Sequence, residues 1–423
     1  VPRHQRGRDA FQELDLGQAF GSICKWVHEL DQPSRVPEVV SRAWTIARSG
    51  RPGPVMIGLP EDMLDEACES PLVPPTPHPR ADVGSDTAAE VAFLLGAAAR
   101  PLAIAGGSRW SEAAIDLLPQ VLPGVPLVTG FRRQDLIDHR LPSFAGSLGL
   151  GADPALVARV AAADLVLAVG DRLDDPTTDG FTLFPPPGAG RRLVHVHPEP
   201  RELGRVFLPT ISIAAEPEAF LRALPPIAGD RARSAWTAAA RAGYVAWSAT
   251  ESVLDEVARG MRDVLPDDAL VTQRAGNFTR PLQRSFAYRR PGRQLAPVGG
   301  SMGYGLPAAL AAKLAHPDRV VVCVAGDGDR LMTAQELATM MLEGAAVVVL
   351  VVDNGVYGTI RTHQQRRYPG RPIGTTLSNP DFVTFAMSFG MQAERTTTAP
   401  DTVAALRRAV ALDRPALVHL VTE

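Results

Sequence analysis

Two short loops rich in oxygen donors lie close together in the C-terminal third of the sequence. One is Gly326-Asp327-Gly328-Asp329, the other is Asp353-Asn354-Gly355, and each follows a run of mostly β-branched residues. The carboxylate of Asp327 and the amide oxygen of Asn354 are hard ligands of the kind that Mg²⁺ prefers. Phosphate oxygens, water and a backbone carbonyl can complete its octahedron. These residue types therefore suit a diphosphate that is held through a metal ion.

The sequence around the loops predicts one βαβ unit. Val320–Ala325 and Ala346–Val352 are expected to be buried strands, joined by a helix with Thr333 as its N-cap and Gly344 as its stop. In open parallel sheets the ligand crevice lies at the carboxyl ends of the strands, so both loops are expected at that edge. Gly328 would let the backbone approach phosphates closely, and amides at the start of a helix can face them.

Each loop also has a simpler interpretation, because Gly-Asp-Gly and Asp-Asn-Gly are common turn sequences. The occurrence of both loops together favours a ligand site, since one helix of ordinary length joins the two loops. A third glycine-rich element, Gly299–Gly305, lies just upstream and opens another helix. Neither the dinucleotide fingerprint nor the Walker lysine motif is present, so the common nucleotide motifs do not explain the three loops. A phosphate-bearing cofactor is the prediction that accounts for them together.

Composition excludes several other classes. The chain has 423 residues, 45% hydrophobic and 21% charged, which fits a globular protein of two or three domains. A net charge of -3 without a basic block argues against nucleic acid, and no apolar stretch is long enough to span a membrane. The scattered Cys24, Cys68 and Cys323 argue against a zinc site or disulfides and favour the cytoplasm; Cys323 is expected in the core. With Lys25 and Lys313 as the only lysines, Schiff-base chemistry is disfavoured.

Short apolar strands alternate with amphipathic helices, which predicts an α/β fold with parallel sheets. We divide the chain into residues 1–70, a linker of residues 71–84 with five prolines, residues 85–226, a join over Pro225–Val245, and residues 246–423. The first block holds too little sheet for a complete domain, so we expect the sequence to be a fragment. The further expected strands are Pro54–Leu59, Leu102–Ala105, Pro126–Val128, Leu165–Val169, Leu193–Val196, Ala269–Thr272 and Ala416–Leu420.

The span from Gly326-Asp327-Gly328 to Asn354 resembles the thiamine diphosphate motif. The surrounding segments are similar to those of acetolactate synthases: Gly303–Ala309, Asn379–Phe382, Arg51–Val55 and Asp9–Glu13. The resemblance covers the whole chain. It implies three-layer parallel-sheet domains, namely the end of the pyrimidine-binding domain, the central domain and the diphosphate-binding domain.

The resemblance also implies roles for single residues. Asp327, Asn354 and the carbonyl of Val356 would bind Mg²⁺, and Met302 would correspond to the bulky residue that bends the cofactor. Plain core packing is the alternative for Met302. The residues expected to contact thiamine diphosphate are Gly276, Asn277, Gly300, Ser301, Met302, Gly326, Gly328, Asp329 and Tyr357.

Three departures from the family stand out. The glutamate that activates the cofactor would lie upstream of Val1, so no residue here takes its role; a naturally short, non-catalytic product is the alternative to a fragment. Asp353 stands where the family usually has Asn. His363 falls where acetohydroxyacid synthases carry a tryptophan that shapes acceptor choice. It is either an acid–base group of the pocket or an exposed loop residue.

Two features of the middle block leave alternatives open. The segments Ala105–Ser108 and Gly170–Asp175 resemble the region that holds FAD in acetolactate synthases, but relatives keep this domain with or without the flavin. His195 and His197 share one strand face, which suggests a metal pair. A structural role is favoured because no third ligand is apparent.

The function that follows from the resemblance is that of a 2-oxo-acid decarboxylase or carboligase dependent on thiamine diphosphate and Mg²⁺. Its substrate would be a small, pyruvate-like 2-oxo acid. Since the family's cofactor lies between domains of two subunits, a homodimer or homotetramer is implied. The alternatives are another thiamine diphosphate-dependent decarboxylase or lyase, and a non-catalytic fragment.

Overall fold

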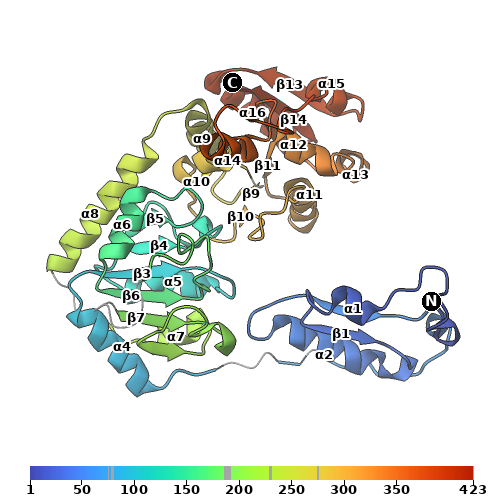
Figure 1. Ribbon diagram of the computed structural model, residues 1–423, viewed down its shortest axis with the longest axis horizontal. Coiled ribbons are helices and arrows are strands. Elements are labelled where there is room, and N and C mark those ends of the chain that lie inside the picture. Colours follow the sequence, from blue (N-terminus) through green and yellow to red (C-terminus); the bar gives the residue numbers. More distant parts are fainter. Residues whose placement is uncertain (75, 78–80, 185–191, 228–230, 274–275, 423) are drawn as a thin grey trace.

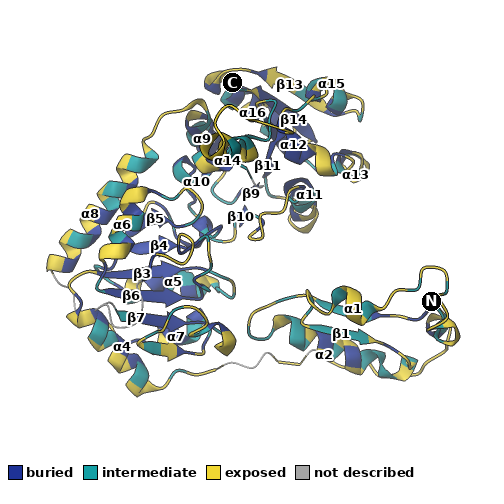
Figure 2. Cartoon of the chain, viewed as in Figure 1, coloured by how far each residue is buried: buried dark blue, intermediate teal, exposed yellow. Residues whose placement is uncertain are grey.

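The computed structural model describes residues 1–74, 76–77, 81–184, 192–227, 231–273 and 276–422 (Figure 1). Within these residues the chain forms two six-stranded parallel sheets and one two-stranded parallel sheet. Helices cover both faces of each large sheet, and buried residues concentrate in the strands between them (Figure 2). The predicted α/β class with three-layer domains is therefore confirmed. No helix in the described part of the chain is long and apolar enough to cross a membrane.

The C-terminal sheet has the strand order β10-β9-β11-β12-β14-β13. Its strands are β9 (Leu270–Thr272), β10 (Gln294–Leu295), β11 (Val321–Gly326), β12 (Val347–Asp353), β13 (Gln392–Thr396) and β14 (Ala416–Val421). Its helices are α9 (Val253–Val264), α10 (Thr279–Ser285), α11 (Gly305–Ala315), α12 (Asp327–Arg330), α13 (Glu336–Leu342), α14 (Gly358–Arg367), α15 (Phe382–Met387) and α16 (Ala399–Ala411).

Strand β11 is buried on both faces, which explains its unbroken apolar sequence. Val322 and Val324 pack in one core cluster with residues of α9 and α16. Cys323 and Ala325 pack in a second cluster with residues of α11 and α13, so the expected core position of Cys323 is confirmed. This two-sided burial fixes β11 in the middle of the sheet, with its carboxyl end beside that of β12.

The connection from β11 to β12 differs from the prediction at its start. Helix α12 begins directly at Asp327, a short 3₁₀ turn follows at Leu331–Thr333, and Gln335 occupies the N-cap of α13. Thr333 is therefore not an N-cap; its hydroxyl donates to the carbonyl of Gly303 over 2.9 Å. Gly344 adopts a φ of 60° just after α13, as a helix stop should.

The central sheet has the order β5-β4-β3-β6-β7-β8, and its direction of winding reverses between β3 and β6. Its strands are β3 (Pro101–Ala105), β4 (Leu127–Thr129), β5 (Phe144–Ser147), β6 (Leu165–Val169), β7 (Arg192–Val196) and β8 (Ile211–Ile213). Its helices are α4 (Ser85–Ala97), α5 (Glu112–Val121), α6 (Pro154–Ala162) and α7 (Pro217–Ala223). The reversal makes the β3–β6 edge the expected ligand crevice of this sheet.

The stretch Pro225–Val245, predicted as the join between the second and third blocks, is largely helical. Helix α8 (Arg231–Ser248) occupies most of this stretch and packs against β5 and α6, along the left side of the molecule in Figure 1. Its buried residues recur at helical spacing: Arg233, Thr237, Ala240 and Tyr244. The helix is therefore a packed layer of the central domain.

Residues 1–70 form a small unit. Strands β1 (Trp26–Glu29) and β2 (Val55–Gly58) pair in parallel, and α2 (Val36–Arg48) covers them, with α1 (Leu16–Phe20) and α3 (Glu61–Leu64) beside them. The buried apolar cluster consists of Leu30, Val39 and Met63. Of the predicted linker, residues 71–74, 76–77 and 81–84 have no regular secondary structure, and residues 75 and 78–80 lie outside the described part.

Tyr244 joins α8 to the rest of the central domain through a buried hydrogen bond. This bond allows the packing to be tested. Its hydroxyl lies 3.1 Å from Nδ1 of the buried His139, whose Nε2 lies 2.8 Å from the carbonyl of Gln134. Tyr244→Phe leaves a buried ring nitrogen without its donor, so we expect it to lower the free energy of unfolding by about 1–3 kcal/mol. Chemical denaturation measures this. Tyr368→Phe, the same change at an exposed position, should leave stability unchanged.

Candidate functional site

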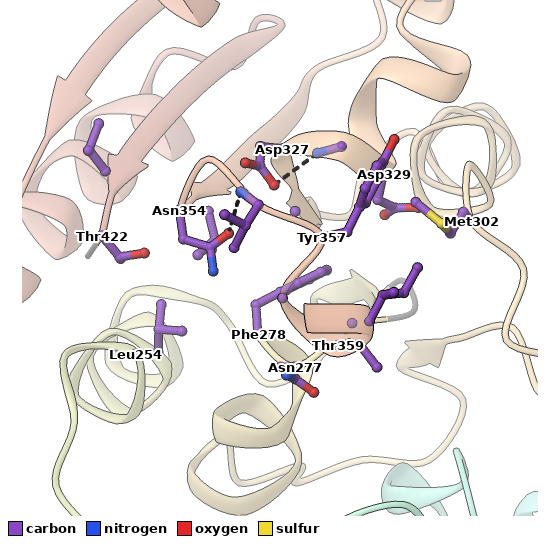
Figure 3. Close-up of a pocket in the computed structure, with 18 of the residues that line it drawn as sticks. Leu254, Asn277, Phe278, Met302, Asp327, Asp329, Asn354, Tyr357, Thr359 and Thr422 are labelled. Atoms are coloured by element: carbon purple, nitrogen blue, oxygen red, sulfur yellow. Dashed lines mark hydrogen bonds between the residues drawn. The ribbon is translucent and has the colours of Figure 1, made fainter. Parts of the chain in front are cut away.

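A cavity of about 920 Å³ lies at the carboxyl ends of β11 and β12 (Figure 3). The two strands pair in parallel, with Gly326 opposite Val352, so the loops that follow them are neighbours, as the sequence predicted. The predicted site residues that line the cavity are Gly276, Asn277, Gly300, Met302, Gly326, Asp327, Gly328, Asp329, Asn354, Val356 and Tyr357. Ser301 and His363 lie outside its lining.

The Asp327 carboxylate is held from two sides. Oδ1 accepts from the amide of Gly328 over 2.9 Å, and Oδ2 accepts from the amide of Gly355 over 2.9 Å and from Nδ2 of Asn379 over 2.8 Å. The side chain is only 4% exposed. Its orientation is therefore set by both loops together, and its oxygens face the cavity edge.

The loop after β12 is fastened by the segment that follows α14. The amide of Tyr357 donates to the carbonyl of Thr375 over 2.9 Å, and the amide of Leu377 donates to the carbonyl of Gly355 over 2.8 Å. Between them, Val356 donates its amide to Oδ1 of Asn354 over 3.3 Å, and the two pairing bonds do not use the Val356 carbonyl. The oxygens of Asn354 and Val356 thus sit in a loop of fixed backbone shape.

Asp329 ties the third glycine-rich element to the site. Its Oδ1 accepts from the amide of Gly303 over 2.7 Å, and Asp329 is 4% exposed. Because Thr333 also donates to the Gly303 carbonyl, this glycine is held at both its amide and its carbonyl. Met302 precedes it and reaches the cavity on the side of Asp329 (Figure 3). The three loops noticed in the sequence therefore meet in one structure.

Close packing explains two of the glycines. A Cβ at Gly328 would lie 2.5 Å from Cε1 of Tyr357 and 2.9 Å from Cδ1 of Leu377. A Cβ at Gly326 would lie 2.8 Å from Cε1 of Phe278, which also lines the cavity. Only glycine lets the backbone approach at these points.

The position of His363 matches neither expectation in full. It lies on helix α14, exposed, with Nδ1 at 3.2 Å from the guanidinium of Arg366. It is therefore neither a loop residue nor part of the cavity lining. The residues of α14 that do line the cavity are Gly358, Thr359 and Ile360, at its start.

Sequence reasoning missed four contributors to the site. Asn379 bonds both Asp327 and Asp353, and His419 bonds Asp353. Phe278 packs against the glycine at the end of β11, and Thr422 lines the far end of the cavity. Asn379 was noted only as part of a family-like segment. The one available signal for His419 is a buried polar position inside the apolar β14.

The ionisation of the carboxylate pair follows from this geometry. Burial raises the pKa of Asp327, and the Asp353 carboxylate beside it adds to the rise. Burial also opposes ionisation of Asp353, but its interaction with Asp327, the acid whose pKa is raised, and its hydrogen bonds from His419 and Gly355 outweigh this, so the pKa of Asp353 is lowered. Two adjacent carboxylates that share neutral donors form a site of excess negative charge, which suits a divalent cation.

Comparisons with known proteins identify the family. A model described as "Thiamine pyrophosphate enzyme, C-terminal TPP binding domain" matches residues 274–420, and one described as "Thiamine pyrophosphate enzyme, central domain" matches residues 88–224. "Probable acetolactate synthase 2, chloroplastic" of Oryza sativa subsp. japonica is 31% identical, over 100% of this chain and 68% of that protein. The chain belongs to the thiamine pyrophosphate enzymes of the acetolactate synthase type.

Two bacterial relatives support the same family assignment. "Acetolactate synthase large subunit" of Parasynechococcus marenigrum is 31% identical over 94% of this chain and 67% of that protein. "Acetolactate synthase isozyme 2 large subunit" of Escherichia coli is 28% identical over 98% of this chain and 76% of that protein. Thiamine pyrophosphate is another name for thiamine diphosphate, so the family predicted from the loops is confirmed.

In the central domain of this thiamine diphosphate enzyme, the strand ends at the β3–β6 edge pack closely against one another. A Cβ at Gly106 would lie 1.8 Å from Oδ2 of Asp171, and one at Gly130 would lie 1.9 Å from the same oxygen. A Cβ at Gly107 would lie 1.9 Å from the Gly170 carbonyl oxygen. The space that these glycines leave is thus filled by the chain itself, with the Asp171 carboxyl wedged between the strand ends.

His195 and His197 are structural, as favoured from the sequence. Nε2 of His195 lies 2.8 Å from the Asp171 carbonyl, and Nδ1 of His197 accepts from the Glu199 amide over 3.0 Å. Burial lowers the pKa of His195 and lowers that of His197 to about 4. Within the described residues, no group of His, Cys, Asp and Glu side chains is arranged to hold a metal ion by itself.

Gly328→Ala tests the close packing at the cavity. The added methyl meets the Tyr357 ring and Leu377, and it pushes apart the loops that carry Asp327 and Asn354. We expect thiamine diphosphate affinity, measured by calorimetry, to fall by about tenfold or more, in line with misplaced metal ligands. Gly243→Ala, where a Cβ meets nothing within 4 Å, is the matched control. Equal affinities in the two variants would contradict the packing argument.

Asp171 predicts a pH dependence of stability. Burial, with a smaller contribution from Asp174, raises the pKa of Asp171 to about 7 from 3.8. Its stabilising contribution is fully present below pH about 4. It falls as pH rises towards about 7, at up to about 1.4 kcal/mol per pH unit, because the unfolded chain loses the proton first. The difference in unfolding free energy between Asp171→Asn and the unsubstituted chain should rise from about pH 5 to about pH 7. A difference in unfolding free energy that stays constant between about pH 5 and about pH 7 would contradict this prediction.

Proposed function

We propose that this chain carries the cofactor site of a thiamine diphosphate- and Mg²⁺-dependent, acetolactate synthase-like 2-oxo-acid decarboxylase or carboligase. One observation supports this above the others. Asp327, Asn354 and Val356 all line one cavity, which lies at the ends of two paired strands and is large enough for a cofactor. The family membership of both large domains agrees with it.

The residues present fit a metal-bound diphosphate. Asp327, the Asn354 side chain and the Val356 carbonyl offer three oxygens of different types, and Asp353 adds negative charge behind them. The amides of Gly328 and Asp329 would bind the diphosphate oxygens. Mg²⁺ would then link these oxygens to the protein side chains.

The remaining walls would position the rest of the cofactor and the substrate. Thiamine diphosphate, when bound, supplies a nucleophilic carbon that adds to the keto carbon of a 2-oxo acid, so that CO2 can leave. Met302, Phe278 and Ile360 give apolar walls that would exclude water around that carbon. The resemblance to acetolactate synthases makes a small, pyruvate-like 2-oxo acid the proposed substrate.

A homodimer or homotetramer is part of this proposal. Apolar side chains at the cavity are half-exposed in the single chain: Val253 at 44%, Met302 at 37% and Ile360 at 51%. A soluble monomer has little reason to leave such side chains grouped at a binding site. A second copy covering the cavity would bury them and close the site against water.

Calorimetric titration of this chain with thiamine diphosphate, with and without Mg²⁺, tests the proposal. We expect binding that requires Mg²⁺. We expect Asp327→Ala to weaken it by at least about tenfold, because the variant loses a charged metal ligand. Asp318→Ala makes the same change at an exposed turn and should bind as the unsubstituted chain does. Binding that is indifferent to Mg²⁺ and to Asp327→Ala would contradict the assigned metal site.

A further inference from the structure

Two carboxylates on neighbouring strands compete for the same hydrogen-bond donors. Nδ2 of Asn379 lies 2.8 Å from Oδ2 of Asp327 and 2.8 Å from Oδ1 of Asp353. The Gly355 amide lies 2.9 Å and 3.0 Å from the same two oxygens. One side-chain amide and one backbone amide thus sit between both acids, so the position of either carboxylate depends on the other.

His419 fixes the far side of this arrangement. Its Nε2 lies 3.0 Å from Oδ2 of Asp353, and the ring is buried in β14, edge-on to Phe382 at a centroid distance of 5.2 Å. The other nitrogen, Nδ1, is buried and has no hydrogen-bond partner within the described residues. Because a carboxylate only accepts, the proton of the neutral ring belongs on Nε2, and Nδ1 carries the lone pair.

We propose that Asp353 and His419 act as a matched positioning pair, which holds the Asn379 and Gly355 donors against Asp327 and so presets the metal-binding carboxylate. This role rests on the proposed function, since it concerns the same metal site. Neither residue would touch the metal ion. The pair would act by fixing the direction of a ligand, which is how groups behind a metal site commonly raise its affinity.

The pairing explains why an acid occupies position 353, where the family usually has Asn. An amide at 353 must turn its oxygen towards Asn379 and Gly355, because both are donors. Its NH2 group then faces Nε2 of His419, which must give up its proton to Nδ1. That nitrogen is buried without an acceptor in the described structure, so the amide would be mispaired here. The histidine and the acid therefore require each other.

The test compares the Mn²⁺ affinities of the unsubstituted chain and its variants in the presence of thiamine diphosphate. The electron paramagnetic resonance signal of free Mn²⁺ gives each affinity. We expect Asp353→Asn to weaken Mn²⁺ binding by about ten- to a hundredfold, and His419→Leu to weaken it by about tenfold. His419→Gln can still donate to Asp353 and should bind Mn²⁺ much as the unsubstituted chain does. The double variant Asp353→Asn/His419→Gln restores a donor–acceptor pair and should recover much of the affinity lost in Asp353→Asn.

Thr396→Val is the control for destabilisation alone. Thr396 lies on β13, the strand next to His419. Its hydroxyl bonds that of Thr402 over 2.8 Å and donates to the backbone carbonyl of His419 over 3.4 Å, but it bonds neither carboxylate. Its Mn²⁺ affinity should stay unchanged even if its thermal midpoint falls. The proposal is overturned if Asp353→Asn binds Mn²⁺ normally, if the double variant recovers nothing, or if Thr396→Val loses as much affinity at an equal midpoint. If the unsubstituted chain binds neither thiamine diphosphate nor Mn²⁺, the proposed function itself falls, and this role with it.

Discussion

The parallel register of β11 and β12 brings two like charges together. Asp327 follows β11, Asp353 ends β12, and pairing of Gly326 with Val352 places the two carboxylates around the same Asn379 amide. Two neighbouring negative charges destabilise each other unless hydrogen-bond donors or a cation lie between them. Asn379, Gly355 and His419 supply the donors, from three different parts of the chain. Much of the site can be understood as the means by which the fold holds this pair.

The apolar sheet behind the pair makes that arrangement stable. The strands are buried on both faces by α9 and α16 on one side and by α11 and α13 on the other. Such a core leaves backbone positions little freedom, so polar groups at the strand ends keep fixed directions. The polar residues lie where the strands stop, and the layers of apolar side chains position them.

The sequence could predict what depends on local pattern. The strands Leu165–Val169 and Ala346–Val352 and the loops after β11 and β12 follow from β-branched runs and turn residues. Asn379 and His419 could not be predicted, because their roles arise from long-range contacts: Asn379 is separated from Asp327 by 52 positions and His419 from Asp353 by 66. Helix α8 was missed although its buried residues recur at helical spacing, since its Ala- and Arg-rich composition obscured the apolar face. Strands β1, β5, β8, β10 and β13 were missed as well, being short or partly exposed.

The two large domains share one architecture but differ in what lies at the carboxyl ends of their strands. In the central sheet, Gly106 after β3 and Gly130 after β4 admit the Asp171 carboxyl, and Gly170 after β6 admits the Gly106 carbonyl. In the C-terminal sheet, the glycines at the end of β11 admit the Phe278 and Tyr357 rings beside an open cavity. In the first case burial of the acid raises its pKa, which costs stability near neutral pH. In the second case a bound cation would offset the charge of the acids. Ligand binding at that edge would then stabilise the folded chain, because the unfolded chain offers no such site.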